Sequence, residues 1–127
     1  MMIGIAGCGK TTYAKLNFPH YKYVSLDEVK NREKEYQILE EFLQKGDSIV
    51  IDDTNLTKYI RAGHFIRIKK YSHKIVGIFF DYSMRKIRTQ NSKREKIVPE
   101  TTIFAMKNQL EPPSYDEGFD KIIQIQE

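Results

Sequence analysis

The sequence predicts an α/β fold with a mainly parallel, doubly wound, five-stranded sheet that carries helices on both faces. Short apolar runs alternate with amphipathic stretches along all 127 residues. This alternation is typical of parallel sheets, because each parallel connection needs a crossover, usually a helix. The chain contains no repeat, low-complexity tract or linker-like segment, and its length suits one hydrophobic core. We therefore expect a single domain over residues 1–127.

The individual elements follow from apolar periodicity and turn signals. Five apolar runs are predicted strands: residues 2–5, 21–25, 48–52, 74–81 and 120–126. The predicted helices are residues 10–16, 28–44, 57–70, 83–89 and 99 to about 110. Gly46 is a stop signal for the second helix and Thr57 can cap the third. Pro99 suits the first position of the last helix.

Charge is distributed unevenly along the chain, which has a net charge of +4. Residues 57–98 contain twelve Lys or Arg and only two Asp or Glu, whereas both flanking parts have an excess of acids. Such a segment indicates a polyanionic partner or a nucleotide's phosphates, and a solvated basic face gives the same pattern. No apolar run approaches the roughly 20 residues that span a bilayer. With one cysteine and no signal-peptide pattern, we expect an intracellular protein, cytoplasmic or nuclear, with no membrane partner.

A glycine-rich segment follows the first predicted strand. Residues 4–11, GIAGCGKT, match the pattern G-x-x-x-x-G-K-[ST], and they lie between a strand and a helix, as a phosphate loop requires. Its glycines let backbone N–H groups surround an anion at the helix N-terminus. Lys10 is expected to neutralise the β- and γ-phosphates of ATP, and the Thr11 hydroxyl to bind Mg²⁺. The sequence thus predicts a P-loop NTPase fold, with ATP bound by Gly4, Ala6, Gly7, Cys8, Gly9, Lys10, Thr11 and Thr12.

Cys8 lies inside this loop. Amide dipoles and the nearby Lys10 both favour a thiolate, so we expect alkylation of Cys8 to inactivate the protein and Mg-ATP to protect it. The alternative is that Cys8 is only a small residue that fits a tight loop.

The third predicted strand ends in Asp52-Asp53-Thr54-Asn55. Parallel α/β sheets bind their ligands at the carboxyl ends of the strands, and an acid there can hold Mg²⁺, usually through water. We therefore assign Asp52, with Thr11, to the metal. A polar strand-to-helix turn, where Asp and Asn are favoured, is the alternative.

Asp27 lies in the stretch VSLDEVK, in which Ser25 and Glu28 have the spacing of a capping box. An acid in the first turn of a helix interacts favourably with the helix dipole. Asp27 is therefore either a helix-stabilising acid or a base that takes a proton from a substrate hydroxyl.

Residues 83–98 are predicted to form a basic lid. Guanidinium groups suit the charge that spreads over a phosphoryl group in transfer, and a closing lid also excludes water. An exposed basic helix followed by a loop is the alternative. The basic residues that this segment brings together are Arg85, Arg88, Lys93 and Arg94.

Together these motifs resemble the kinase domain of polynucleotide 5′-hydroxyl kinases, both the bacteriophage enzyme and the animal bifunctional kinase–phosphatase. The resemblance covers nearly the whole chain and rests on five stretches in this order: GIAGCGKTT, SLDEVK, IDDTNL, QNSKREKIVP and KNQLEPPSYDEGFDKI. It implies a P-loop kinase that uses Mg²⁺ and transfers the ATP γ-phosphate to a 5′-hydroxyl end of DNA or RNA, in nucleic acid repair. The D-x-D-x-T/V motif of the phosphatase domain is absent, which leaves room for a separate phosphatase or ligase partner.

The resemblance also implies roles for single residues. Asp27 falls in the place of the family's catalytic base, although Ser25-Leu26 stands where the family usually has Asn-Arg. Lys30 lies where the bacteriophage enzyme has an arginine on the acceptor side, and Gln90 replaces a basic lid residue. Family members carry an acid at one of the two positions that match Asp52 and Asp53. The expected catalytic residues are Lys10, Asp27 and Arg94, and the expected substrate-binding residues are Lys30, Asp53, Thr54, Asn55 and Arg88.

Two other functions fit parts of the pattern. A small-molecule kinase of the same fold would act on a metabolite or nucleoside, but a small neutral acceptor does not require the basic segment 57–98. A nucleotide-dependent nucleic-acid-binding protein without transfer activity would require neither Asp27 nor Arg94. The N-K-x-D signature of guanine recognition is absent, which argues against a GTPase switch.

Overall fold

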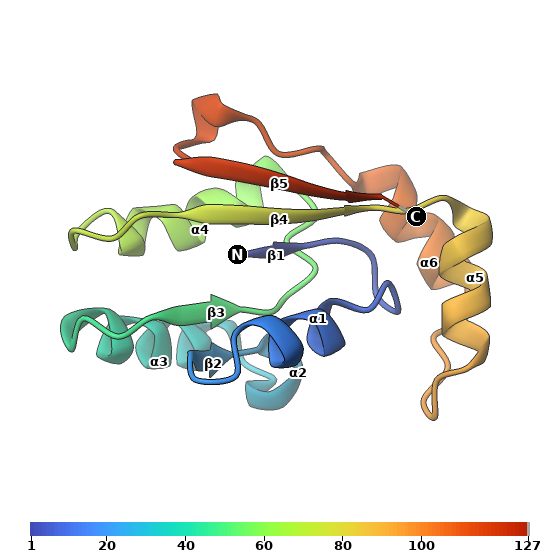
Figure 1. Cartoon of the computed structure of the whole chain (residues 1–127), viewed down its shortest axis with the longest axis horizontal. Helices are drawn as coiled ribbons and strands as arrows, with labels where there is room; N and C mark the ends of the chain where they lie inside the picture. The colour runs from blue at the N-terminus through green and yellow to red at the C-terminus, as the bar shows by residue number, and fades with distance from the viewer. Residues whose placement is uncertain (127) are drawn as a thin grey trace.

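The computed structural model describes residues 1–126 and contains the five expected parallel strands (Figure 1). Strand β1 pairs with β4 and β4 with β5, while β2 pairs with β3, all in parallel. A single parallel bridge between Met2 and Asp52 joins the two groups, so the order across the sheet is β2-β3-β1-β4-β5. This confirms the predicted P-loop NTPase-like α/β fold. The strands are β1 (Met2–Ile3), β2 (Lys22–Val24), β3 (Ile49–Ile51), β4 (Val76–Asp81) and β5 (Lys121–Gln126).

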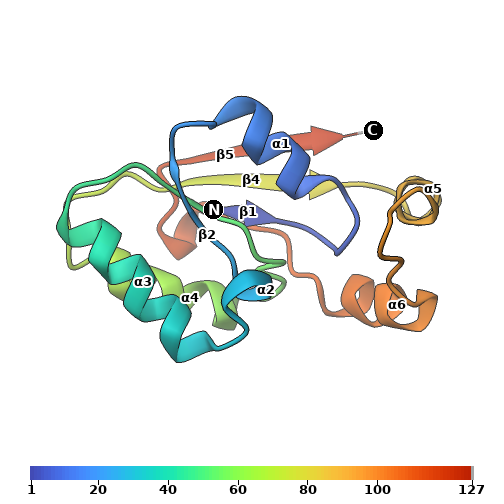
Figure 2. The same cartoon turned by 90° about the horizontal axis from the view of Figure 1, so that it is seen from below.

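Helices cover both faces of the sheet, as Figure 2 shows. Helix α1 lies on one face, and α3, α4 and α6 lie on the other. Helix α5 stands beyond the carboxyl ends of the strands, with α6 beside it. The helices are α1 (Lys10–Asn17), α2 (Leu26–Val29), α3 (Arg32–Gln44), α4 (Lys58–Ile68), α5 (Met84–Ser92) and α6 (Glu100–Gln109), with a 3₁₀ turn, η1 (Tyr115–Glu117).

The strands divide their side chains between two cores, because successive residues of a strand point to opposite faces. One core lies on the α1 side and contains Met2, Val50, Ile78 and Phe80 together with Ala14 of α1. The other lies on the α3 and α4 side and contains Ile3, Ile51 and Phe79 with Leu39 and Phe65. This alternation continues past the last residue of β3 and governs the direction of the two acids that follow it.

The structure corrects several expected helix boundaries, among them the end of the helix expected over residues 83–89, which continues to Ser92 as α5. The single helix expected over residues 28–44 is two helices, because Lys30 adopts a left-handed conformation (φ 64°) and ends α2. Asn31 then starts α3 by accepting a hydrogen bond from the Lys34 N–H. Thr57 caps α4 as expected, whereas Pro99 is the N-cap of α6 rather than its first residue.

The C-terminal tail is tied to the rest of the molecule by a buried ion pair. Arg61 of α4 is fully buried, and its Nε lies 2.8 Å from Glu117 Oε1 and its Nη2 3.1 Å from Glu117 Oε2. The same guanidinium donates to the Asn55 carbonyl at 2.8 Å. One side chain thus holds the tail, α4 and the loop after β3.

We predict that Glu117→Ala destabilises the fold by about 3–5 kcal/mol, because it leaves the Arg61 charge buried without its partner. Urea unfolding followed by circular dichroism measures the change, and Glu95→Ala, an exposed carboxylate in the lid, is the control. A loss no larger than that of the control would mean that the pair does not hold the tail.

Candidate active site

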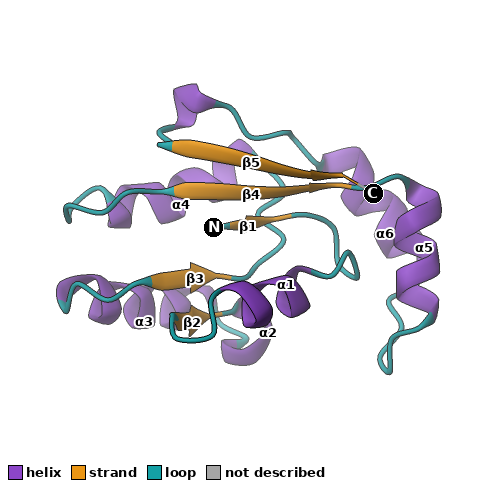
Figure 3. Cartoon of the chain, viewed as in Figure 1, coloured by secondary structure: helices purple, strands orange, loops and turns teal. Residues whose placement is uncertain are grey.

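A cavity of about 700 Å³ opens at the carboxyl ends of the strands. Its walls come from the loop after β1, from α1 and α2, from the end of β3 and from α5 with the loop after it. In Figure 3 these loops and helix ends gather on the side to which the strand arrows point. The cavity brings together four parts that are far apart in the sequence: the phosphate loop, the acids that follow β3, Asp27 of α2 and the lid.

The loop after β1 has the backbone geometry of a phosphate cradle. Gly7 and Gly9 adopt positive φ values of 85° and 91°, a conformation that glycine adopts without steric cost, and α1 begins directly after them at Lys10. The Lys10 amine donates to the Ile5 carbonyl at 3.0 Å. Seven of the eight expected ATP-binding residues line the cavity: Ala6, Gly7, Cys8, Gly9, Lys10, Thr11 and Thr12. Gly4 lies behind the loop, where a Cβ atom would come within 2.8 Å of Cys8 Sγ.

The expected thiolate at Cys8 is wrong. The side chain is buried, with 1% of its surface exposed, and it packs in the core on the α1 side. Burial raises the pKa of the thiol, and the nearby Lys10 only partly offsets this effect. Cys8 is therefore a packing residue beneath the loop, as the alternative interpretation held.

Asp52 faces α1 and contacts two hydroxyl groups. Its Oδ2 accepts a hydrogen bond from Thr11 Oγ1 at 2.6 Å and another from the Tyr23 hydroxyl. Partial burial and the hydrogen bond to Asp52 raise the pKa of Tyr23, which keeps it a donor. A carboxylate and a hydroxyl side by side beneath a phosphate loop are hard oxygen donors, the kind that Mg²⁺ prefers. Thr11 and Asp52 therefore fit the metal expected from the sequence, and Tyr23 is a neighbour that sequence reasoning missed.

Asp53 faces the opposite way, and both of its oxygens have partners within the protein. Oδ1 accepts from the Leu26 N–H at 2.8 Å, at the start of α2. Oδ2 lies 3.3 Å from Arg32 Nη1 and 3.3 Å from His64 Nε2. Asp53 borders the cavity, but its carboxylate is engaged with three structural elements rather than free to receive a substrate.

Asp53 belongs to a cluster with the buried Glu35 and His64 and the partly exposed Arg32. The guanidinium lies 2.6 Å from Glu35 Oε1 and 3.4 Å from His64 Nε2. Ligand atoms of the two acids and the histidine lie within 4.8 Å of one another, close enough for a metal ion. Arg32 contacts all three residues, so its guanidinium supplies the positive charge that a metal would supply. The cluster escaped sequence analysis because its members come from three segments without a shared motif.

The pKa values of the two acids of this cluster shift in opposite directions. Burial disfavours the charged form of both. For Asp53, hydrogen bonds with His64, Glu35 and the Leu26 N–H outweigh this effect and lower the pKa to about 2. For Glu35, burial and the hydrogen bond with Asp53 raise the pKa to about 8. These opposite shifts favour the negative charge on Asp53 and the proton on Glu35.

Helix α2 carries Asp27 at the mouth of the cavity. Ser25 is the N-cap residue, but its side chain makes no capping hydrogen bond, so the expected capping box with Glu28 is wrong. The Asp53 carboxylate binds the free Leu26 N–H instead. Asp27 is the second residue of the helix, is exposed and lines the cavity.

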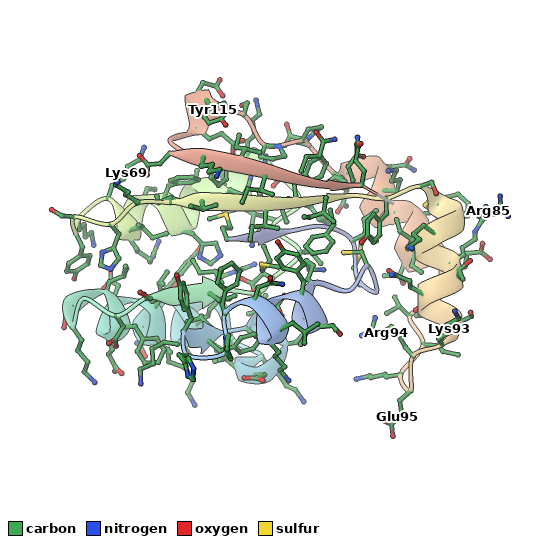
Figure 4. The ribbon with its side chains drawn as sticks, in the orientation of Figure 1. Lys69, Arg85, Lys93, Arg94, Glu95 and Tyr115 are labelled. Atoms are coloured by element: carbon green, nitrogen blue, oxygen red, sulfur yellow. The ribbon has the colours of Figure 1, made fainter. Side chains whose placement is uncertain are left out.

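The lid meets the phosphate loop through its second half. Arg94 and Lys93 line the cavity, and Arg94 Nη1 would lie 3.3 Å from a Cβ atom at Gly7. With its amide nitrogen turned to the loop, Gln90 donates to the Gly7 and Cys8 carbonyls at 3.3 and 3.2 Å. Figure 4 shows Arg94 projecting from the chain below α5, toward the end of α1.

Other expected site residues lie outside the cavity. Arg88 is paired with Glu100 at 2.6 Å and lies over the Phe104 ring. Lys30 is exposed at the end of α2, and Arg32, with a third of its side chain exposed, lines the cavity in its place.

The two residues that follow the acid pair have different surroundings. Thr54 lines the cavity, and its carbonyl accepts from the Gly4 N–H at 3.0 Å. Asn55 is 1% exposed and donates to the Met2 carbonyl at 2.7 Å. Asn55 therefore supports the loop, and the expectation that it binds substrate does not fit its burial.

The basic segment 57–98 does not form one continuous face. Lys69 lies near the amino ends of the strands, whereas Arg85, Lys93 and Arg94 lie around α5 at the opposite end (Figure 4). Arg61, between them in sequence, is buried. Besides Lys10, the cations that line the cavity are Arg32 and the lid residues Lys93 and Arg94. Within residues 1–126, no helix has the length and apolar character needed to cross a membrane.

The fold and the site define a P-loop nucleotide-binding domain of the kinase-like type. The AAA domain family model matches residues 1–113, and the chain belongs to this family. Over 132 aligned residues it is 26% identical to a bifunctional polynucleotide phosphatase/kinase from Schizosaccharomyces pombe, covering 98% of this chain and 32% of that protein. The chain thus spans about a third of the length of this relative.

Several solved structures share the fold. Kti12 from Chaetomium thermophilum, solved in complex with ADP-AlF₃, has a TM-score of 0.74 at 14% identity, with 98% of this chain and 87% of that chain covered. A gluconokinase from Sinorhizobium meliloti 1021 has a TM-score of 0.72 at 14% identity, with 98% and 79% covered. A sugar kinase from Janibacter sp. HTCC2649 has a TM-score of 0.70 at 18% identity, with 98% and 82% covered.

Proposed function

We propose that the chain is a kinase that transfers the γ-phosphate of ATP to the 5′-hydroxyl end of a nucleic acid. The observation that carries this proposal is the position of Asp27, which opens into the same cavity as the phosphate loop and Arg94. A nucleotide-binding switch needs neither a carboxylate opposite the phosphates nor a lid arginine. The match to the polynucleotide phosphatase/kinase over 98% of the chain supports the acceptor class.

In this proposal the chain's residues act mainly by placement and charge, because phosphoryl transfer requires little covalent chemistry from the protein. The loop amides and Lys10 hold the β- and γ-phosphates. Asp27 accepts the proton of the attacking hydroxyl. Arg94 approaches the transferred group from the lid side. Mg²⁺, held by Thr11 and Asp52, would neutralise phosphate charge.

The acceptor is expected to enter beside α2, where Arg32 is the cation that lines the cavity. Its guanidinium is fixed by Glu35 and Asp53, and a third of the Arg32 side chain remains exposed. A guanidinium held in this way suits bidentate contact with a phosphate. We therefore assign to Arg32 the contact with the acceptor's first phosphate that the sequence had suggested for Lys30.

A small-molecule kinase is the second candidate. Two structures with this fold are described as a gluconokinase and a sugar kinase. In addition, Lys69 of segment 57–98 lies at the end of the molecule opposite to Arg85, Lys93 and Arg94 (Figure 4). The two candidates share the phosphate loop and the base, and they differ only in the acceptor.

The acceptor is tested by transfer of labelled γ-phosphate to 5′-hydroxyl DNA and RNA oligonucleotides, single- and double-stranded, and to a panel of gluconate, sugars and nucleosides. We predict label on the 5′-hydroxyl oligonucleotides alone. Oligonucleotides that already carry a 5′-phosphate are the matched control acceptor, and Lys10→Ala is the control for the loop. Transfer to a sugar or nucleoside, with none to the oligonucleotides, would establish the second candidate.

We predict that Asp27→Asn lowers kcat by at least about a hundredfold, because a positioned base contributes roughly 10²–10⁴ in rate. ATP affinity and melting temperature should change little, since the side chain is exposed. Glu28→Gln, the same loss of charge one residue along α2, should remain within a few-fold of the wild type. Equal kcat values for the two variants would make Asp27 only a helix-stabilising acid.

A further inference from the structure

Helix α2 has too few bonds of its own to fix the side chain that it carries. It contains four residues, it has no side-chain cap from Ser25, and a left-handed residue ends it. A helix of this length is not stable by itself. Its first N–H, that of Leu26, is bound by Asp53 Oδ1 at 2.8 Å. The position of α2, and of Asp27 with it, therefore depends on the position of the Asp53 carboxylate.

The Asp53 carboxylate in turn is held from behind by α3 and α4. His64, fully buried in α4, lies 3.3 Å from Oδ2, and a carboxyl oxygen of Glu35, fully buried in α3, lies within 4.8 Å of a carboxyl oxygen of Asp53. The only ionisable groups of residues 1–126 described in contact with Glu35 are Arg32 from its own helix, Asp53 from the strand end and His64 from α4.

We propose that Glu35 is a positioning residue, whose neutral carboxyl group donates a hydrogen bond to Asp53 and so fixes α2 with Asp27 at the cavity. This inference rests on the proposed function only for the role of Asp27. Glu35 itself is fully buried and is not among the residues that line the cavity.

The surroundings of Glu35 favour a proton on its carboxyl group. One carboxyl oxygen, Oε1, accepts from Arg32 at 2.6 Å, while the other, Oε2, is buried and finds no donor around it. Two ionised carboxylates side by side in this interior would repel each other. A proton on Glu35 removes the repulsion and converts it into a hydrogen bond to Asp53. Loss of this proton at alkaline pH would push Asp53 away from the Leu26 N–H.

The test compares Glu35→Gln with the wild type. Glutamine reproduces the neutral carboxyl group, since its oxygen accepts from Arg32 and its amide donates to Asp53, but it cannot ionise. Glu33→Gln, an exposed acid on the same helix, is the matched control. The first readout is the Leu26 amide signal in ¹⁵N NMR spectra from pH 6 to pH 9.5, which needs no substrate. The second is the pH profile of kcat and of KM for ATP, measured with whichever acceptor the wild type phosphorylates.

We expect the Leu26 amide signal of the wild type and of Glu33→Gln to titrate with a midpoint near the Glu35 pKa of about 8, and that of Glu35→Gln to stay constant. In parallel, kcat of the wild type should fall through the same range with KM for ATP unchanged, while Glu35→Gln keeps its kcat to higher pH. Titration at Leu26 in Glu35→Gln, or failure of this variant to fold at pH 7, would overturn the proposal. If the Leu26 results hold and no 5′-hydroxyl end is phosphorylated, the positioning role stands and the proposed function fails.

Discussion

The arrangement of the site depends on the joint between β1 and β3. Strand β1 has only two residues, so its pairing with β3 is reduced to one bridge between Met2 and Asp52. Side-chain and backbone bonds complete the joint, from Asn55 to the Met2 carbonyl and from Gly4 to the Thr54 carbonyl. Because the phosphate loop leaves β1 here and the acid pair leaves β3, this joint fixes the distance between them.

The alternation of side chains along β3 then gives the two acids different surroundings. Asp52 follows Val50 to the α1 face, where it meets Thr11 beneath the phosphate loop. Asp53 follows Ile51 to the other face, where it meets α2, α3 and α4. We infer that Asp52 serves the nucleotide side of the cavity, whereas Asp53 serves the acceptor side indirectly, by holding the helix that carries Asp27. This inference gives separate tasks to two adjacent and chemically identical residues.

Much of the fold and of the nucleotide side of the site could be predicted from the sequence, because these features depend on residues that are close together in the chain. The phosphate loop, the five strands and the Thr57 cap each follow from a short pattern of residues. What escaped prediction depends on contacts between distant segments. The left-handed Lys30 splits an apparently continuous helix. Burial of Cys8 reverses the expected effect of its neighbours, and the cluster around Asp53 joins three segments. The basic segment was visible as composition, but its separation into two ends of the molecule required the fold.

The division of labour between the two acids is tested most directly by calorimetric titration of an unreactive ATP analogue, with and without Mg²⁺, into Asp52→Asn and Asp53→Asn. Folding of both variants is checked by circular dichroism. The account predicts that Mg²⁺ strengthens nucleotide binding to Asp53→Asn as much as to the wild type, and that Asp52→Asn loses about tenfold or more of this effect. An undiminished Mg²⁺ effect in Asp52→Asn, together with its loss in Asp53→Asn, would contradict the account.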